Sequence, residues 1–320
     1  MNKERSLSSA VPTRHRIIGL ALAFAAGMIL AIQARINGAL GTDLGNGVVA
    51  AMISFVTGLV LLGVIAVCRP SVRHRFGQVR SALRDRRLVW WQLLGGISGA
   101  FLVLAQGVTV TAIGVATFTV AVVGGQLVSS LVVDRAGLGP AGKAPVTLHR
   151  AVGAAVALVA VLIATAGGLT GGAAAVALAV LPAVAGFGTA WQQAVNGRVG
   201  VVGGPVVATV INFAVGTIAL IIATAVSLLV HGLPPALPAQ PWLYLGGVIG
   251  VLFIGSAAMI VRWVGVLLLG MTSIAGQLTG AVLVELVAPT EAGLSSIKVV
   301  GCVLTLVGVL IAVRPRRRSR

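Results

Sequence analysis

The chain has 320 residues, of which 58% are hydrophobic and only 9% charged, and its mean hydropathy is +1.07. Soluble domains carry about 25% charged residues, so this composition excludes a soluble globular protein and indicates one that spans a membrane several times. A net charge of +17 favours a nucleic-acid partner in a soluble protein, but here we expect a lipid bilayer as partner and no nucleic acid.

Ten apolar runs follow one another along the chain, each about long enough to cross the roughly 30 Å of bilayer hydrocarbon as a helix. They lie at residues 17–36, 47–67, 89–110, 115–133, 149–167, 173–193, 205–230, 242–261, 266–287 and 297–313. Short segments bearing Gly, Pro or Arg separate the runs and leave no room for a soluble domain. The sequence therefore predicts an all-α integral membrane protein with ten transmembrane helices.

The basic residues gather on one side of this predicted bundle. If the ten spans alternate in direction, 21 of the 23 Lys and Arg residues fall on the side of the N-terminus, and the loop from Arg69 to Arg87 holds seven of them. The positive-inside rule makes that side the cytoplasm, so both termini are predicted to be cytoplasmic. An alternative interpretation of the arginine-rich loop is a site for anionic lipid or a regulatory partner.

An internal repeat divides the chain into two units of five predicted helices. The segment from Trp91 aligns without a gap with the segment from Trp242, at an offset of 151 residues. This alignment pairs Gln126 with Gln277 and Asp134 with Glu285. We therefore expect a first unit at residues 17–170 and a second at 171–313, flanked by cytoplasmic tails at 1–16 and 314–320.

A second part of the repeat carries polar residues inside apolar runs. The stretch "AIQARINGALG" matches "WQQAVNGRVG", and "AAMISFVTG" matches "ATVINFAVG". Because each unit has an odd number of spans, the second unit must enter the membrane from the opposite side. The units are thus predicted to be inverted repeats related by a pseudo-two-fold axis in the membrane plane, which is the usual basis of alternating access.

This pattern of a Gln, then Asn-Gly four residues on, then an apolar helix with Ser-Phe or Asn-Phe and a Gly, resembles a known family. It is similar to the YdcZ-like inner-membrane exporters of the drug/metabolite transporter superfamily, in both halves and over nearly the whole chain apart from its tails. Members are often a single five-helix unit, so the chain looks like two such units fused. The resemblance implies a multi-pass transporter of small molecules in the bacterial inner membrane.

Two matched glutamines are the candidate substrate-binding residues. Gln126 and Gln277 each lie about eleven residues into a span, roughly 16 Å deep at about 1.5 Å per residue and so close to the midplane. Transporters built from inverted repeats bind their substrates at this level. The alternative is that both glutamines only form hydrogen bonds between helices.

Six further polar residues form two matched sets that are candidate gates for the cavity. The sets are Gln33, Asn37 and Ser54 toward the outer face, and Gln192, Asn196 and Asn212 toward the cytoplasm. Residues four apart share a helix face, which places the Gln and Asn of each set side by side. The alternative is that Asn-Gly merely ends a helix and that Arg35 extends to the outer interface.

Asp134 and Glu285 are the candidates for coupling transport to protons, since they are the carboxylates matched across the repeat. Each lies in the last turn of a predicted span, where it could instead simply be hydrated. The first span has no acid, unlike that of the small multidrug exporters of the same superfamily, whose first-helix glutamate exchanges protons for cationic drugs. A neutral or zwitterionic polar solute is therefore the better guess for the substrate.

No enzyme, metal or cofactor site is expected from this sequence. The four histidines are scattered over loops and interfaces, and the two cysteines show no metal or redox spacing. We therefore predict a secondary transporter, most naturally an exporter of a small polar metabolite or drug-like compound by alternating access. A channel-like facilitator and a transport-inactive membrane scaffold or sensor subunit are the alternatives, and a homodimer is left open.

Overall fold

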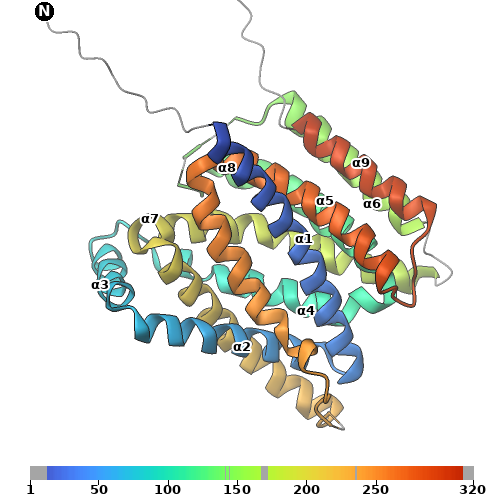
Figure 1. The fold of residues 1–320 in the computed structure, drawn as a ribbon, viewed down its shortest axis with the longest axis horizontal. Coiled ribbons are helices and arrows are strands. Elements are labelled where there is room, and N and C mark those ends of the chain that lie inside the picture. The colour runs from blue at the N-terminus through green and yellow to red at the C-terminus, as the bar shows by residue number, and fades with distance from the viewer. Residues whose placement is uncertain (1–12, 141, 144, 167–171, 235, 313–320) are drawn as a thin grey trace, which may run out of the picture.

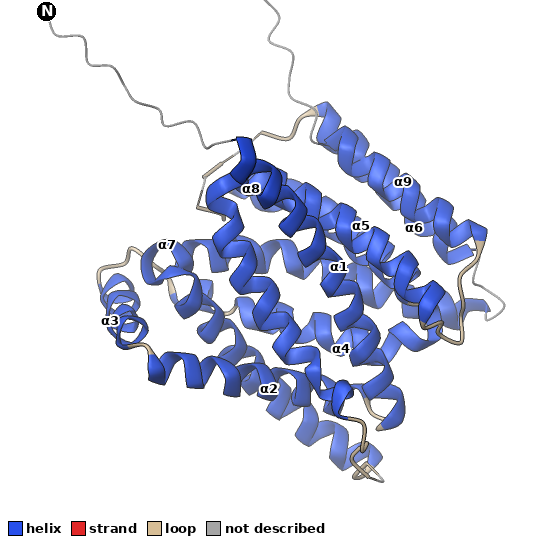
Figure 2. Ribbon diagram, viewed as in Figure 1, coloured by secondary structure: helices blue, strands red, loops and turns tan. Residues whose placement is uncertain are grey.

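The computed structural model describes residues 13–140, 142–143, 145–166, 172–234 and 236–312. Every regular element within these residues is a helix (Figure 2). The elements are α1 (Thr13–Asp43), α2 (Gly47–Cys68), α3 (Pro70–Arg84), η1 (Trp90–Leu93), α4 (Gly95–Ile113), α5 (Val115–Ala136), α6 (Leu148–Ala166), α7 (Gly172–His231), η2 (Pro241–Leu245), α8 (Gly246–Val287) and α9 (Ser296–Ala312). Of the predicted tails at residues 1–16 and 314–320, residues 13–16 belong to α1, and the rest lie outside the described residues.

The described helices have the length and the surface of membrane spans. Six stretches are long and apolar enough to cross a bilayer, and three shorter apolar helices lie at residues 148–164, 241–254 and 296–312. Large apolar side chains cover the outside of the bundle, and Leu162 and Leu229 are 70% and 88% exposed. Such a surface suits contact with lipid. The prediction of an all-α membrane protein is confirmed.

Helix α7 consists of two helices. Its 60 residues would reach about 90 Å as one straight helix, three times the thickness of the hydrocarbon. The helix breaks at Gly204, where φ is 80° and ψ is 166°. Glycine adopts this positive φ without the steric penalty that a Cβ imposes. The break separates a first part that ends at Gly203 from a second part that begins at Pro205.

Helix α8 also has two parts, because it reverses direction along α1. In chain order, Gly246, Gly250, Gly276 and Gly280 of α8 lie against Asn37, Gln33, Phe24 and Met28 of α1. Along α8, the residue number of the contacted position in α1 first decreases and then increases again. The ribbon of α8 correspondingly turns back part-way (Figure 1). With α7 and α8 each divided in two, an apolar helix overlaps each of the ten predicted runs, and that all ten cross the membrane stays a prediction.

The interpretation that Asn-Gly ends a helix is wrong. Helix α1 continues through Asn37 and Gly38 to Asp43, and α7 continues through Asn196 and Gly197. Gly38 lies so close to Val110 of α4 that a Cβ there would come within 2.8 Å of the valine side chain. The glycine therefore permits close helix packing and does not supply a left-handed cap.

The arginine-rich segment is a helix and not the loop that we predicted. Helix α3 begins at Pro70, a residue suited to the first turn because its missing N–H has no intrahelical partner there. Val72, Val79 and Ala82 are buried on one side of α3 and pack against α7. The helical periodicity of these apolar residues was hidden by the many arginines between them.

Neighbouring helices divide the bundle into a central part and an outer pair. Helix α1 packs on α8 and α4, α7 packs on α4 and α5, and α6 and α9 form a pair at one side (Figure 1). We call the two ends of the bundle the Asn37 end, where α1, α4 and α8 finish, and the Asn196 end, where the first part of α7 and α5 finish. The candidate site lies between these ends.

Candidate functional site

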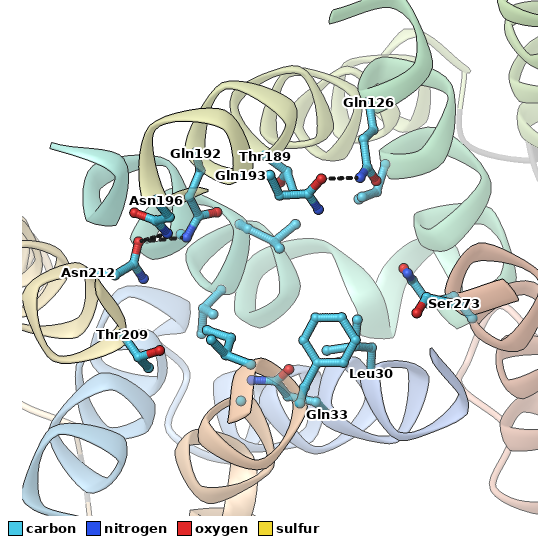
Figure 3. Close-up of a pocket in the computed structure, with 18 of the residues that line it drawn as sticks. Leu30, Gln33, Gln126, Thr189, Gln192, Gln193, Asn196, Thr209, Asn212 and Ser273 are labelled. Atoms are coloured by element: carbon cyan, nitrogen blue, oxygen red, sulfur yellow. Dashed lines mark hydrogen bonds between the residues drawn. The ribbon is translucent and has the colours of Figure 1, made fainter. Parts of the chain in front are cut away.

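A cavity of about 620 Å³ lies at the centre of the bundle, between α1, α2, α4, α5, α7 and α8 (Figure 3). Most of its lining is apolar and includes Phe55, Phe118, Phe213 and Phe253. Its polar lining consists of Gln33, Ser54, Gln106, Thr119, Gln126, Thr189, Gln192, Gln193, Asn196, Thr209, Asn212, Ser273 and Gln277. Among the described residues that line it, none is charged.

Four polar side chains form what we call the Asn37 cluster: Gln33, Asn37, Ser54 and Gln106. The Asn37 amide donates to the Gln106 side-chain oxygen at 2.7 Å, and the Ser54 hydroxyl donates to Asn37 Oδ1 at 3.0 Å. Gln33 Nε2 donates to the backbone oxygen of Gly246 at 2.9 Å. The cluster thus ties α1 to α2, α4 and α8 at the Asn37 end.

Three polar side chains form the Asn196 cluster: Gln192, Asn196 and Asn212. Gln192 Nε2 and Asn196 Nδ2 both donate to Asn212 Oδ1, each at 2.9 Å (Figure 3). These bonds join the first part of α7 to its second part. Each of the two sets predicted from the sequence is therefore brought together in space.

Both clusters pack against glycines, and the repeat alignment pairs the glycines of one cluster with those of the other. A Cβ at Gly250 would come within 2.9 Å of the Gln33 amide, and a Cβ at Gly99 within 2.5 Å of the Gln192 amide. Gly246 likewise lies against Asn37, and Gly95 lies against Asn196. Each cluster therefore comes from one half of the chain and packs on glycines of the other half.

The two clusters differ in burial. In the Asn37 cluster, Asn37 is 0% exposed and Gln106 is 4% exposed, whereas Gln192 and Asn196 are half-buried. The cavity continues past Asn196 along Gly197, Gly200, Val201 and Pro205. At the opposite end, the matching helix is packed shut, because Gly41 lies directly against the backbone of Gly107. The cavity therefore extends toward the Asn196 end and is closed at the Asn37 end.

Gln126 and Gln277 both line the cavity, on α5 and on the second part of α8. Gln126 Nε2 donates to Gln193 Oε1 at 3.2 Å (Figure 3). No hydrogen bond joins the Gln277 side chain to another residue in the described part of the chain. The matched glutamines share the cavity but not the same partners.

Two phenylalanines meet at the centre of the bundle. The rings of Phe55 on α2 and Phe213 on α7 have centroids 4.9 Å apart. Phe55 lies against Gly216, and Phe213 lies against Gly58. The repeat alignment pairs these residues with each other, so the contact is reciprocal, and aromatic pairs of this spacing stabilise packing.

The two matched carboxylates lie in different surroundings. Glu285 is 1% exposed and accepts hydrogen bonds from Val115 N at 2.7 Å and Thr290 N at 2.9 Å, and also from the Thr290 hydroxyl. Lys298 is also buried close by and donates to the backbone oxygens of Ala292 and Gly293. Glu285 is thus not hydrated at the interface, because it caps the start of α5.

Asp134 forms an ion pair with Arg150 that is partly open to solvent. The repeat alignment pairs Arg150 with Lys298, so both carboxylates have a cation at the matching position. Asp134 and Arg150 both belong to the first half, however, whereas Glu285 binds the backbone of the other half. Within the described residues, no three His, Cys, Asp or Glu side chains come together to hold a metal ion.

Gln106 and Gln193 were missed by the sequence reasoning. The repeat alignment sets them opposite Ala257 and Ala34, so a search restricted to matched polar pairs passes over both. Their signal was an amide inside an apolar run, which is costly in a membrane unless a partner is present. Arg35 also has partners, since it donates to the carbonyls of Ala288 and Pro289, directly after α8.

Comparison with family models gives two matches, which cover residues 18–163 and 177–311 and carry the description "Putative inner membrane exporter, YdcZ". The chain belongs to the YdcZ family of inner-membrane exporters. The resemblance inferred from the Gln and Asn-Gly pattern is confirmed, and so is the location of this YdcZ-family protein in the inner membrane. A comparison with curated proteins found no match.

Proposed function

We propose that this YdcZ-family protein is a secondary transporter that exports a small neutral or zwitterionic polar solute by alternating access. The observation that carries this proposal is the central cavity, which lies between two matched polar clusters of which one is buried and the other lines its open end. A closed barrier on one side and an open path on the other is the arrangement that alternating access requires.

Reciprocal contacts support an inverted pair of five-helix repeats. Gly27 contacts Ser273 while its counterpart Gly186 contacts Val122, the counterpart of Ser273. Gly276 contacts Phe24 while Gly125 contacts Ala183 in the same way. Each half thus packs on the other through the same positions, as a pseudo-two-fold axis between them requires.

The helix-end arginines repeat this reciprocity with one difference. Arg198 donates to the carbonyls of Leu138 and Gly137 at 2.7 and 2.8 Å, at the end of α5. Arg35 binds the matching carbonyls at the end of α8, but it lies one helical turn earlier in its own helix by the repeat alignment. Each first helix therefore holds the fourth helix of the other half, with an offset of one turn between the two ends.

The distribution of basic residues supports a cytoplasmic Asn196 end and an outer Asn37 end. Helix α3 with its arginines, Arg150 and Arg198 all lie at the Asn196 end. By the positive-inside rule this end faces the cytoplasm. The conformation is then inward-open, with the Asn37 cluster as the closed outer gate and the Asn196 cluster beside the open inner path.

The chemistry of the lining supports an uncharged or zwitterionic solute. Amide side chains both donate and accept hydrogen bonds, and the lining described carries no charge to pair with an ion. Transfer of an unpaired ion into such a cavity is costly. The volume of about 620 Å³ lies within the range of about 300–1,000 Å³ that holds drug-sized molecules. We assign substrate binding to Gln126 and Gln277.

We further propose that Glu285 takes part in coupling, together with its counterpart Asp134. Protonation of Glu285 would remove the negative charge that holds Val115 N and balances Lys298, and would loosen the contact between the halves at the Asn37 end. Asp134 would take the equivalent role when the Asn196 end closes. The repeat alignment, which pairs Asp134 with Glu285 and Arg150 with Lys298, supports this exchange.

Counterflow in proteoliposomes tests the transport proposal. A panel of neutral, zwitterionic and charged solutes is screened with the wild type, Gln126→Leu, Gln277→Leu and the control Gln240→Leu, whose residue is exposed in a loop. We expect saturable counterflow of a neutral or zwitterionic solute. The counterflow should fall at least about tenfold in both cavity variants, because each loses about one buried hydrogen bond to the solute, and should be kept in the control.

The same assay separates the alternatives. Flux without saturation or counterflow would support a channel-like facilitator and overturn alternating access. Counterflow that survives both cavity substitutions would remove the glutamines from substrate binding. Absence of flux for every solute in a correctly folded preparation would support the transport-inactive scaffold or sensor.

A further inference from the structure

Helix α3 covers the break in α7. A Cβ at Gly203 would come within 2.6 Å of the Val79 side chain, and the Arg75 guanidinium lies directly against Gly204. At the matching break near Gly45, at the other end of the bundle, a Cβ added to that glycine would meet no other segment within 4 Å. The cover over Gly204 is therefore an addition to one half that the repeat itself does not explain.

Three arginines of α3 form a stripe along one flank of the helix. At about 100° per residue, Arg73, Arg80 and Arg84 fall within about 40° of one another around the helix axis, and Arg69 directly precedes the helix. All four arginines are exposed, while the opposite flank carries Ser71, His74, Gln78 and Ser81, and Arg75 lies against Gly204. A bias toward positive charge in cytoplasmic segments does not require such an alignment.

The stripe has no acidic partner in the described part of the chain. Asp85 follows α3, but it forms its ion pair with Arg87 at 3.2 Å. Three aligned guanidinium groups with free donors match the phosphate of an anionic headgroup, which accepts paired hydrogen bonds from such groups.

We propose that the stripe of α3 binds the headgroups of anionic phospholipids. We further propose that this binding controls how the two parts of α7 are positioned at the break at Gly204. The position of α3 supports a lipid as the occupant, because α3 follows the membrane span α2 with only Arg69 between them. A soluble phosphate compound would reach the same charges, but it would not be held at the bilayer surface.

The link to the cavity runs through the residues beside the break. Val201 and Pro205 line the cavity, and Val199 and Val207 pack in the same apolar cluster as Val79 of α3. A headgroup that fixes α3 therefore fixes the two parts of α7 at the open end of the cavity. This regulatory step rests on the proposed transport function, whereas lipid binding by the stripe does not.

Quenching by brominated lipids measures the binding directly. Trp90 begins η1, six residues beyond the end of α3, and is 68% exposed. In a variant that keeps only Trp90 among its tryptophans, we expect brominated phosphatidylglycerol to quench more strongly than brominated phosphatidylcholine. The preference should be abolished by the triple substitution Arg73→Gln, Arg80→Gln and Arg84→Gln. Each arginine is expected to contribute about fivefold to the affinity for the anionic lipid.

Two controls complete the binding test. The triple Arg→Lys variant should keep the preference because it keeps the charge, and Gln78→Ser should leave it unchanged. If the single-tryptophan variant does not fold, the phosphatidylglycerol that co-purifies with the otherwise wild-type and triple Gln proteins is measured by mass spectrometry. Equal quenching of the single-tryptophan protein by both lipids, or equal amounts of phosphatidylglycerol on the wild-type and triple Gln proteins, overturns the proposal.

The control of the break is tested without transport. Cysteine at Val201, in a Cys68→Ser background, is labelled with a water-soluble maleimide in liposomes with and without phosphatidylglycerol. We expect a change in labelling rate of at least about threefold on adding the anionic lipid, lost in the triple Gln variant. An unchanged rate in the presence of proven binding would overturn the regulatory step alone.

Discussion

The Asn37 end and the Asn196 end of the bundle are built from the same sequence pattern but are packed differently. At the Asn37 end, Asn37 has two side-chain partners and is fully buried. At the Asn196 end, Asn196 donates to Asn212 alone and lies beside the open cavity. The difference teaches that a repeated pattern specifies two polar clusters without specifying which one is packed shut.

The largest expected effect contrasts the two carboxylates. Glu285→Ala should lower the free energy of unfolding by about 3–5 kcal/mol, because it leaves Lys298 buried without its negative neighbour and Val115 N without an acceptor. Asp134→Ala should cost about 1 kcal/mol or less, since its ion pair is partly exposed. Denaturant unfolding in detergent measures both. Equal losses would show that the two ends are packed alike.

A smaller contrast is expected between the two asparagines. Asn37→Leu removes two hydrogen bonds and leaves Gln106 and Ser54 buried without that partner, at about 1–2 kcal/mol per bond in a membrane. Asn196→Leu removes one bond at a half-buried position. Thermal unfolding should therefore show a midpoint that falls about twice as far for Asn37→Leu. A larger fall for Asn196→Leu would contradict the assignment of the closed end.

The smallest effect is a ratio of labelling rates. Cysteine introduced at Val201, beside the open cavity, should react with a water-soluble maleimide at least about tenfold faster than cysteine at the buried Val110. A tenfold ratio corresponds to about 1.4 kcal/mol between closed and open arrangements of the Asn37 end. The measurement uses purified protein in a Cys68→Ser background. Similar rates at the two positions would indicate that the ends open with equal ease.

Much of the architecture could be predicted because lipid imposes simple rules on a chain. A span must satisfy its backbone hydrogen bonds within its own helix, so an apolar run of sufficient length is a helix. Helix ends were less predictable. Asn37-Gly38 resembles a helix end in isolation, but the close approach of α4 keeps α1 helical to Asp43.

The candidate site was predicted in part for a similar reason. The matched pairs pointed to Gln33, Asn37 and their counterparts, and the structure brings each set together. Gln106 and Gln193 have no counterpart, and only tertiary packing brings them to Asn37 and Gln126. The surroundings of Glu285 also could not be read, because its partner Val115 is 170 residues away in the chain.

The sequence by itself determined the spans, the duplication and the family, since hydrophobic length and repeated polar positions are properties of the chain read in order. Only the tertiary structure decided that the Asn37 end is shut, that α3 covers Gly204 and that Glu285 caps α5. These features depend on contacts between segments far apart in the chain. The two halves carry nearly the same local pattern, so the choice between their two arrangements comes from how they pack together.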